Sequence, residues 1–368
     1  MPPSPDGAAS GGEWISRPYA PADEQGILDL CSRVFGSEMP PDLWRWQFPD
    51  NPFATAVVQV AEDSGGRIIG HYSQVPVPLW RDGESQLGSY SILSMIDPGH
   101  QRKGILKRLA ADAESRLVEQ GILTGATFLN ENSYPVYTGQ LEWTEVYKRL
   151  PVVFLVFDVG AVASRYTGSV LGRVVGFLGK PIRSVVFRQQ RAVPDSLLEI
   201  RKAARIDPRV DALWSELRTG FRYATDRTSL YLAWRIDQNP RQYQIYIAEN
   251  GNELVGLAVT RIDQKFGQRI AYLVEFLISP GRLDAAQALL QSALGDLRKE
   301  GCGMITALAP EPGGQRELLR HCGFRDLPPF LAPHAIHFCV KDRHRPVQQQ
   351  ALADPAGWWV SWSDHDVV

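Results

Sequence analysis

Hydrophobic and polar positions alternate along the chain with two periods, one typical of strands and one of helices. In the first half they predict a strand at 14–18, a helix at 21–35, a short helix ending near 50, and strands at 56–61, 68–79 and 87–96. A helix from 105, a strand at 123–129, a short helix at 134–141 and a long strand region at 143–157 follow. The helix from 105 crosses between two strands, so we expect those strands to be parallel and adjacent.

The most informative stretch runs from Ile92 to Leu117. A short apolar run ends at Asp97-Pro98-Gly99, a basic turn of Gln101 to Gly104 follows, and the helical pattern begins at Ile105. Glycine lets the backbone approach a ligand closely, and the free N–H groups of a first helical turn attract an anion. The pattern therefore favours a phosphate or pyrophosphate site. The alternative is an ordinary turn whose basic residues face water.

The second half repeats the layout of the first. The segment Trp46-Gln47-Phe48-Pro49-Asp50-Asn51-Pro52 is matched by Trp234-Arg235-Ile236-Asp237-Gln238-Asn239-Pro240, and Ile96-Asp97-Pro98-Gly99 by Ile278-Ser279-Pro280-Gly281. Self-similarity of this length predicts a duplicated domain. The second copy has no Gln/Arg-x-x-Gly after Gly281, and Asp284 would repel a pyrophosphate at the start of its helix. We expect only the first copy to bind one.

The turn and its surroundings resemble the GNAT superfamily of N-acyltransferases. The family signature is Gln/Arg-x-x-Gly-x-Gly/Ala, and the turn here reads Gln101-Arg102-Lys103-Gly104-Ile105-Leu106, with leucine at the last position. The downstream Asn130-Glu131-Asn132-Ser133-Tyr134 looks most like the branch found in polysaccharide and amino-sugar biosynthesis. The resemblance implies an α/β fold (a mixed α+β sheet) with two tandem GNAT-like lobes, the C-terminal one degenerate.

The expected domain organisation follows from the repeat. We expect a disordered tail at 1–13, an acyl-CoA-binding domain at 14–158, a basic helical linker at 159–194, a degenerate domain at 195–345 and an aromatic tail at 346–368. The linker either packs across both lobes with its basic face in water or contacts membrane lipid or an anionic substrate. The aromatic tail either adds a strand or contributes to a sugar-binding surface. The second lobe would complete a sheet, form a dimer contact or wall the acceptor site.

The resemblance also implies how acetyl-CoA would bind. Backbone groups of two strand residues would hold the pantetheine arm like an added strand, the turn would hold the pyrophosphate, and an asparagine would anchor the far side of the arm. The candidate cofactor-binding residues are Met95, Ile96, Gln101, Arg102, Lys103, Gly104, Ile105, Leu106, Asn130 and Asn132.

The family reaction, direct attack of an amine on an acyl thioester, needs an acid for the leaving thiolate and a base for the amine. Tyr137 is the first candidate acid and Tyr134 the second, since a phenol with a pKa near ~10 can protonate a thiolate. Glu131, acting through water, and His71 are candidate bases. Each of the four also has an ordinary structural interpretation, as a core aromatic, a solvated turn acid or a buried histidine.

Composition excludes several function classes. The 368 residues carry a net charge of −2, so no global basic field recruits nucleic acid. The four cysteines are widely spaced without a CxxC pair, which favours reduced thiols over disulfides or zinc ligands. No apolar run approaches the roughly 18–20 residues of a membrane span, and the start lacks a signal pattern, which predicts a cytoplasmic protein.

The sequence therefore predicts an acetyl-CoA-dependent N-acetyltransferase without a metal. The expected acceptor is a small amine, in first place an amino sugar carried on a nucleotide. The alternatives are an antibiotic, a polyamine or a protein lysine as acceptor, or a non-catalytic module that binds acyl-CoA or a partner.

Overall fold

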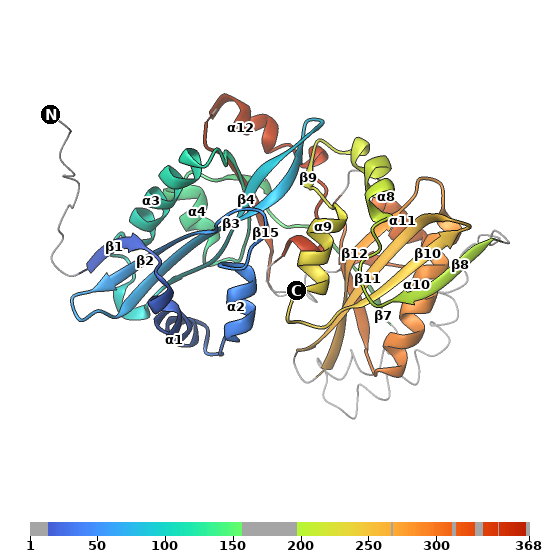
Figure 1. Cartoon of the computed structure of the whole chain (residues 1–368), viewed down its shortest axis with the longest axis horizontal. Helices are drawn as coiled ribbons and strands as arrows, with labels where there is room; N and C mark the ends of the chain where they lie inside the picture. Colours follow the sequence, from blue (N-terminus) through green and yellow to red (C-terminus); the bar gives the residue numbers. More distant parts are fainter. Residues whose placement is uncertain are drawn as a thin grey trace.

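The computed structural model describes residues 14–156, 197–265, 268–310, 314–327, 334–344 and 346–365. They form two β-sheets that lie side by side, each with helices against it (Figure 1). The tail predicted at 1–13 and the linker predicted at 159–194 lie outside the described residues.

The first sheet has the strand order β1-β2-β3-β4-β5-β15-β6, and β9 also pairs with β3. Its strands are β1 (Trp14–Pro18), β2 (Val57–Asp63), β3 (Ile68–Arg81), β4 (Glu84–Ile96), β5 (Thr124–Leu129), β6 (Thr144–Tyr147), β9 (Tyr223–Thr225) and β15 (His337–Asp342). As predicted, β4 and β5 are parallel neighbours.

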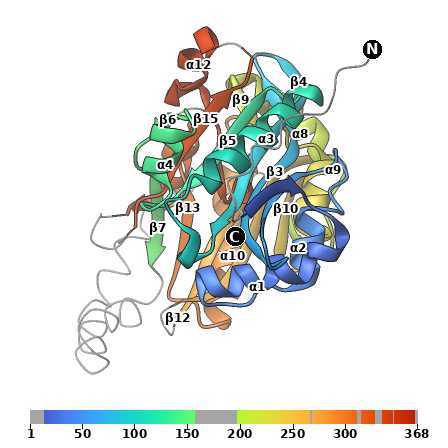
Figure 2. The ribbon, with the colours of Figure 1, turned by 90° about the vertical axis from the view of Figure 1, so that its left-hand side faces the viewer.

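Helices cover both faces of the first sheet (Figure 2). The apolar sides of α1 (Glu24–Phe35) and α2 (Pro41–Gln47) join the large core between the lobes. On the opposite face, α3 (Ile105–Glu119) and α4 (Tyr134–Gln140) enclose a separate core. The buried residues of α3 recur every three or four positions, which is why this segment forms an amphipathic helix.

The second sheet has the order β14-β7-β13-β12-β11-β10-β8. Its strands are β7 (Val152–Val156), β8 (Leu198–Ala203), β10 (Gln244–Asn250), β11 (Glu253–Lys265), β12 (Gln268–Ile278), β13 (Met304–Leu308) and β14 (Arg325–Asp326). Helix α10 (Leu283–Lys299) packs on one face through an alanine and leucine stripe, and α8 (Val210–Leu217) contacts the other. The other α-helices in the described ranges are α9 (Ser229–Leu232), α11 (Gln315–His321) and α12 (Pro346–Leu352).

The two sheets exchange strands, which the hydrophobic pattern did not predict. The long strand expected at 143–157 is instead two strands on either side of Pro151, β6 in the first sheet and β7 in the second. Proline lacks an N–H and fixes φ, so it ends a strand. In return β15, from near the C-terminus, pairs with β5 and β6. The predicted boundaries at 158 and 345 stay predictions, because the first sheet takes β9 and β15 from the second half of the chain and the second sheet takes β7 from the first.

The aromatic C-terminal segment is part of the core. Trp358, Trp359 and Trp362 are buried, and their rings lie against aromatic side chains such as Tyr223 and Tyr272. The segment makes a single bridge to β9 and then short helical turns rather than a strand. It therefore adds no strand in the part of the chain that the structure describes, and its contribution to a sugar-binding surface stays a prediction.

Equivalent positions of the repeat meet at the interface between the lobes. The rings of Trp46 and Trp234 stack with centroids 4.9 Å apart, and Trp46 Nε1 donates to the Trp234 carbonyl oxygen at 3.0 Å. The duplicated motif thus joins the two halves.

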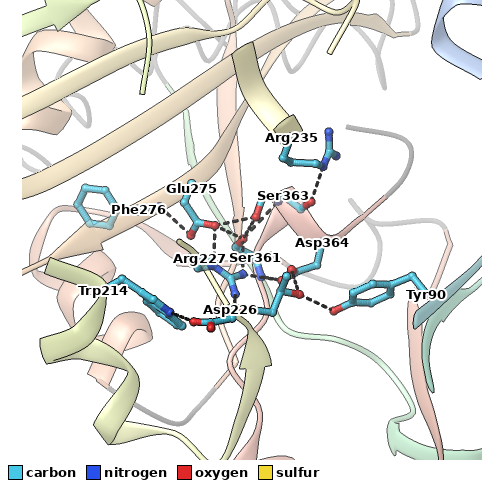
Figure 3. A network of polar contacts seen from close by, with 11 residues as sticks. Tyr90, Trp214, Asp226, Arg227, Arg235, Glu275, Phe276, Ser361, Ser363 and Asp364 are labelled. Atoms are coloured by element: carbon cyan, nitrogen blue, oxygen red, sulfur yellow. Dashed lines mark hydrogen bonds and ion pairs between the residues drawn. The ribbon is translucent and has the colours of Figure 1, made fainter. Parts of the chain in front are cut away.

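A buried ionic network also crosses this interface (Figure 3). The side chain of Arg227 is fully buried between Glu275 of β12, at 2.7 Å, and Asp364, at 2.6 Å. Asp364 accepts from Thr225, whose hydroxyl lies 3.1 Å from that of Tyr90 on β4. A buried ion is tolerated only when it is paired, so this network fixes the lobes and the C-terminal segment relative to one another.

None of the described helices is long and apolar enough to cross a membrane. The four cysteines Cys31, Cys302, Cys322 and Cys339 are free thiols, and burial raises the pKa of each.

Candidate active site

Strands β4 and β5 diverge partway along their length and open a cleft in the first sheet. They are paired only where Gly88 to Ser91 lie opposite Thr124 to Thr127. Beyond Ser91, β4 continues to pair with β3, while none of the described strands pairs with its other edge. A cleft of about 500 Å³ lies at this divergence.

A bulge distorts β4 at the cleft. The register shifts between His71 and Ser73 of β3, which gives β4 one extra residue, and Leu93 takes a φ of +51°. Two side chains of β3 hold the bulge. The His71 ring donates from Nδ1 to the Leu93 carbonyl oxygen at 2.7 Å, and Ser73 Oγ donates to the Ile92 carbonyl oxygen at 2.7 Å.

The wall of the cleft comes from both halves of the chain. The first half contributes the end of α1, the segment into α2, the bulge of β4, the end of β5 and the start of α4. The second half contributes Arg241, the segment 334–336 and His365. Of the roles expected for the second lobe, completing a sheet and walling the cleft are thus both observed.

Tyr137 is the candidate acid that lines this cleft. It lies on α4 with only 2% of its surface exposed, and its hydroxyl is 2.8 Å from Ser91 Oγ and 2.6 Å from Ser94 Oγ. Both serines belong to β4 where it leaves β5. The phenol is therefore held by hydrogen bonds at the floor of the cleft.

Tyr134, one turn earlier, has different surroundings. Its hydroxyl donates to Glu145 at 2.5 Å and its ring stacks on His337. The bond to Glu145, with burial, raises the pKa of Tyr134 to about 12. Tyr134 is absent from the cleft lining.

The two candidate bases are not among the residues that line the cleft. His71 is fully buried, and burial lowers its pKa from 6.5 to about 4, so the ring is neutral near pH 7. Glu131 is exposed next to the rim residue Asn130, and its carboxylate lies 4.0 Å from the His334 ring. The structure thus places His71 behind the bulge and Glu131 at the rim.

The basic turn forms an open helix N-terminus. Gln101 to Gly104 are exposed, and Gly104 is the N-cap of α3 with a φ of +76°. No side chain caps this end and its first turn holds no acid, so its backbone donors suit an anion. Ile105 is buried, and Leu106 packs against the core beneath α3.

The remaining candidate residues extend from this turn to the cleft. Met95 and Ile96 pair with β3 through one edge. Asn130 lines the cleft, but its side-chain oxygen accepts from the N–H groups of Asn132 and Ser133 in the turn before α4. Asn132 is exposed and outside the lining.

Sequence reasoning gave no role to Gln47. Gln47 is 8% exposed, lines the cleft and a small adjoining cavity, and its side-chain amide has no hydrogen-bond partner among the described residues. The sequence did contain a sign of its position, because Gln47 is a polar residue between the apolar Trp46 and Phe48 on the buried side of α2. Ser91 and Ser94 were also given no role.

The corresponding parts of the second lobe are different. The first turn of α10 holds Asp284, which pairs with Arg282 at 2.9 Å. Glu275 on β12 bonds Ser361 and Ser363 of the C-terminal segment (Figure 3). The second lobe thus has an acid at the helix start and a buried charge network on the strand that corresponds to β4.

Comparisons with known proteins agree with this architecture. Residues 16–144 match the family model described as Acetyltransferase (GNAT) domain, and residues 209–324 match Acetyltransferase (GNAT) family. A search of curated proteins found no match.

Similar solved structures include three with high coverage of this chain. A probable N-acyltransferase from Enterococcus faecalis V583 has a TM-score of 0.61 at 9% identity, covering 90% of this chain and 73% of its own. Saccharomyces cerevisiae N-myristoyltransferase with bound myristoyl-CoA has a TM-score of 0.61 at 11% identity. The match covers 92% of this chain and 81% of the yeast chain. A tandem GNAT protein from the clavulanic acid biosynthesis pathway has a TM-score of 0.57 at 13% identity. The match covers 90% of this chain and 99% of that protein's chain.

At these identities the structural likeness establishes the fold, while the two family models establish the kind of domain. The cleft at diverging strands and the open helix N-terminus lie in the first matched region. The second matched region has the same fold, and its Arg227 and Glu275 form a buried ion pair at the interface between the lobes. The chain, with its two GNAT domains in tandem, belongs to the GNAT superfamily of acyltransferases.

Proposed function

We propose that the chain is an acetyl-CoA-dependent N-acetyltransferase that modifies a small primary amine in the cleft of its first lobe. The observation that carries this proposal is the position of Tyr137, whose hydroxyl is held by two serines where β4 and β5 diverge. The second lobe, with Asp284 at its helix start, does not bind acyl-CoA in this proposal and serves to wall the acceptor site.

The free edge of β4 connects the two parts of the proposed site. The pyrophosphate would bind the N-terminus of α3, where Gly104 opens the backbone and Arg102 and Lys103 add positive charge. The pantetheine arm would follow the edge of β4 at Met95 and Ile96, as an added strand does. The thioester would then reach the cleft beside Tyr137.

The chemistry follows from this placement. The amine nitrogen attacks the thioester carbonyl carbon and a C–N bond forms, after which the C–S bond breaks. The leaving thiolate takes the proton of Tyr137, while the proton lost by the amine passes to water and returns to the phenolate. Glu131 stands at the rim and is our proposed base through such water.

Two features of the cleft bear on the acceptor. Gln47 offers an amide that has no partner among the described residues, and Glu38 offers an exposed carboxylate, which suit a hydroxyl group and an ammonium. Much of the remaining wall is apolar, including Met39, Leu43 and Phe128. An amino sugar, the acceptor class favoured by the sequence resemblance, would use the polar groups. An amine with an apolar portion would contact both the polar groups and the apolar wall.

A panel of amines with thiol-release detection tests the proposal. The panel should hold free and nucleotide-linked amino sugars, aminoglycosides, polyamines and a lysine peptide, each with acetyl-CoA and with myristoyl-CoA, the ligand of the similar yeast protein. We expect acetyl transfer to one class of small amine. Acetyl-CoA binding without transfer to any amine would support the non-catalytic module instead.

Gln47→Leu tests the acceptor contact. Removing a buried amide that bonds the acceptor should raise KM for the amine about tenfold, because a tenfold effect corresponds to one such hydrogen bond. The Kd for acetyl-CoA serves as the control and should not change. An unaltered KM would remove Gln47 from the acceptor site.

A further inference from the structure

The carboxylate of Asp97 lies directly after β4, at the start of the turn that leads into α3. Its side chain is 9% exposed and caps a 3₁₀ helix at Pro98–His100 by accepting from the Gly99 N–H at 3.1 Å. Two guanidinium groups from other elements also donate to it. Arg33 Nε of α1 lies 3.0 Å from Asp97 Oδ2, and Arg67 Nη2, from the connection between β2 and β3, lies 2.7 Å from the same oxygen. One buried carboxylate thus joins three segments at the base of the turn.

These contacts occupy both oxygens of the carboxylate. The two arginines bond Oδ2, while Oδ1 accepts from the Gly99 N–H and lies 3.4 Å from Nδ1 of the His100 ring. Burial alone would raise the pKa of Asp97, but the bonds from Gly99, His100 and Arg33 outweigh burial and lower it. The carboxylate is therefore charged near pH 7, and the two guanidinium groups compensate its charge beside a turn proposed to bind an anion.

The turn that follows Asp97 contains an unfavourable backbone conformation. Arg102 has a φ of +63°, two residues before Gly104 with its φ of +76°. The left-handed region suits glycine but costs free energy for arginine, and such a conformation persists only where the surrounding structure determines it. The buried Ile105 fixes the end of the turn at α3. The contacts of Asp97 fix the other end.

The second lobe has a serine in place of this carboxylate. The N–H of Ser279 donates to the Val255 carbonyl oxygen at 3.0 Å, just as the N–H of Asp97 donates to that of Ile69 at 2.8 Å. The residues that follow take different conformations. Gly281 has a φ of +78°, whereas the first lobe forms the 3₁₀ helix that Asp97 caps. Of the two turns, the one with the carboxylate is thus the one proposed to bind acyl-CoA.

We propose that Asp97 is a positioning residue that holds residues 98–104 in the conformation that binds the pyrophosphate of acetyl-CoA. This inference rests on the proposed function, in which the N-terminus of α3 binds that group. Asp97 does not touch the cofactor in this proposal, because both of its oxygens are occupied by groups of the protein. It keeps the backbone donors of the turn in place before acetyl-CoA arrives, so that binding does not have to order them.

The substitution Asp97→Ser introduces the residue of the second lobe at this position. A serine hydroxyl carries no charge and cannot hold both arginines, so the turn should populate other conformations. We expect the Kd for acetyl-CoA, measured by calorimetry, to rise about tenfold or more, because the apparent Kd grows as the binding conformation becomes rarer. At saturating acetyl-CoA kcat should stay within about twofold. Hydrogen exchange of the amides at 98–106 in the free protein should become faster.

The matched control is Asp23→Ser. The Asp23 side chain is also 9% exposed, pairs with Arg17 and accepts from the Ala20 N–H, but it belongs to the turn before α1. The control should lose comparable stability in urea and leave the Kd for acetyl-CoA within about twofold. A second variant, Arg67→Met, removes the 2.7 Å bond of a half-exposed arginine and should raise the Kd about threefold.

The outcomes separate the positioning role from the proposed function. A wild-type Kd in folded Asp97→Ser, or an equal rise of Kd in Asp97→Ser and Asp23→Ser, would overturn the positioning role. If Asp97→Ser does not fold, a wild-type Kd and unchanged hydrogen exchange in Arg67→Met would overturn it. A wild-type protein that binds no acetyl-CoA would overturn the proposed function instead. The hydrogen exchange, measured without ligand, would then still decide whether Asp97 fixes the turn.

Discussion

Tyr137 and Tyr134 stand one turn apart on α4, yet only one of them is suited to give up a proton in the cleft. The hydroxyl of Tyr137 meets two serines, which can support a phenolate. The hydroxyl of Tyr134 is bound to a carboxylate, Glu145, and this bond opposes loss of its proton. The difference comes from the partner of each phenol rather than from the residue type.

Replacing each tyrosine by phenylalanine tests this distinction. Tyr137→Phe should lower kcat about 100-fold, within the range for losing a general acid, and leave the Kd for acetyl-CoA unchanged. Tyr134→Phe, the matched control, should lower kcat less than about threefold, because it removes only a hydrogen bond outside the cleft. Thiol-release kinetics and calorimetry give the two quantities. Similar losses in both variants would move the acid role to water.

The bulge of β4 is the element that opens the cleft, and His71 is its support. The imidazole is neutral and donates to the Leu93 carbonyl oxygen. Nothing in the described structure bonds its Nε2 atom, which lies in an apolar environment. A histidine that is held in this way serves the shape of the strand, so we propose a structural role for it in place of the base role that the sequence suggested.

The depressed pKa of His71 predicts how stability depends on pH. In the unfolded chain the ring takes up a proton below about pH 6.5, whereas the folded protein resists protonation down to about pH 4. The unfolded state therefore binds more protons between these values, and the free energy of unfolding falls as the pH falls. The total loss is about 3 kcal/mol from this group.

Urea denaturation of wild type and His71→Gln at pH 7 and pH 5 measures this contribution. The wild type should lose about 2 kcal/mol more than the variant between the two pH values, since each unit is worth about 1.4 kcal/mol. All other titrating groups are shared and cancel in the comparison. The same pH dependence in both proteins would contradict a buried neutral His71.

Local periodicity predicted most elements, because α3 and β4 owe their form to their own apolar spacing. It also placed the open turn at Gly104 correctly, since the turn is a local feature. The strand exchange was not predictable, because Val152–Val156 and His337–Asp342 read as ordinary strands whichever sheet they join. The same holds for Arg343 and Gln74, which are 269 positions apart and meet only through that exchange.

At the scale of the whole molecule, the shape of the cleft depends on how the two lobes are held together. The cleft is walled by residues of both halves, so a shift of one lobe would change the acceptor site. Arg227 stands at the centre of the contact, with two carboxylates and no access to water. Removing a buried cation leaves its partners charged and unpaired.

Arg227→Met should therefore lower the free energy of unfolding by about 3–5 kcal/mol. The matched control is Arg222→Met, which breaks the exposed pair with Asp82 and should cost less than about 1 kcal/mol. Chemical denaturation of both variants gives the comparison. Equal effects would mean that the buried network does not hold the lobes together.

The repeat offers the sharpest test of which lobe binds acyl-CoA. Gly104, the N-cap of α3, and Gly281, just before the N-cap of α10, both lie in the turn that leads into a helix, with φ values of +76° and +78° and open space around each. Glutamate at either position meets the same backbone strain. Only at Gly104 would the new carboxylate stand at the proposed pyrophosphate site.

Calorimetric titration with acetyl-CoA of wild type, Gly104→Glu and Gly281→Glu is the most direct measurement. We predict one bound acetyl-CoA per chain in wild type and in Gly281→Glu, and none in Gly104→Glu. Normal binding by Gly104→Glu, or its loss in Gly281→Glu, would contradict acyl-CoA binding at the first lobe.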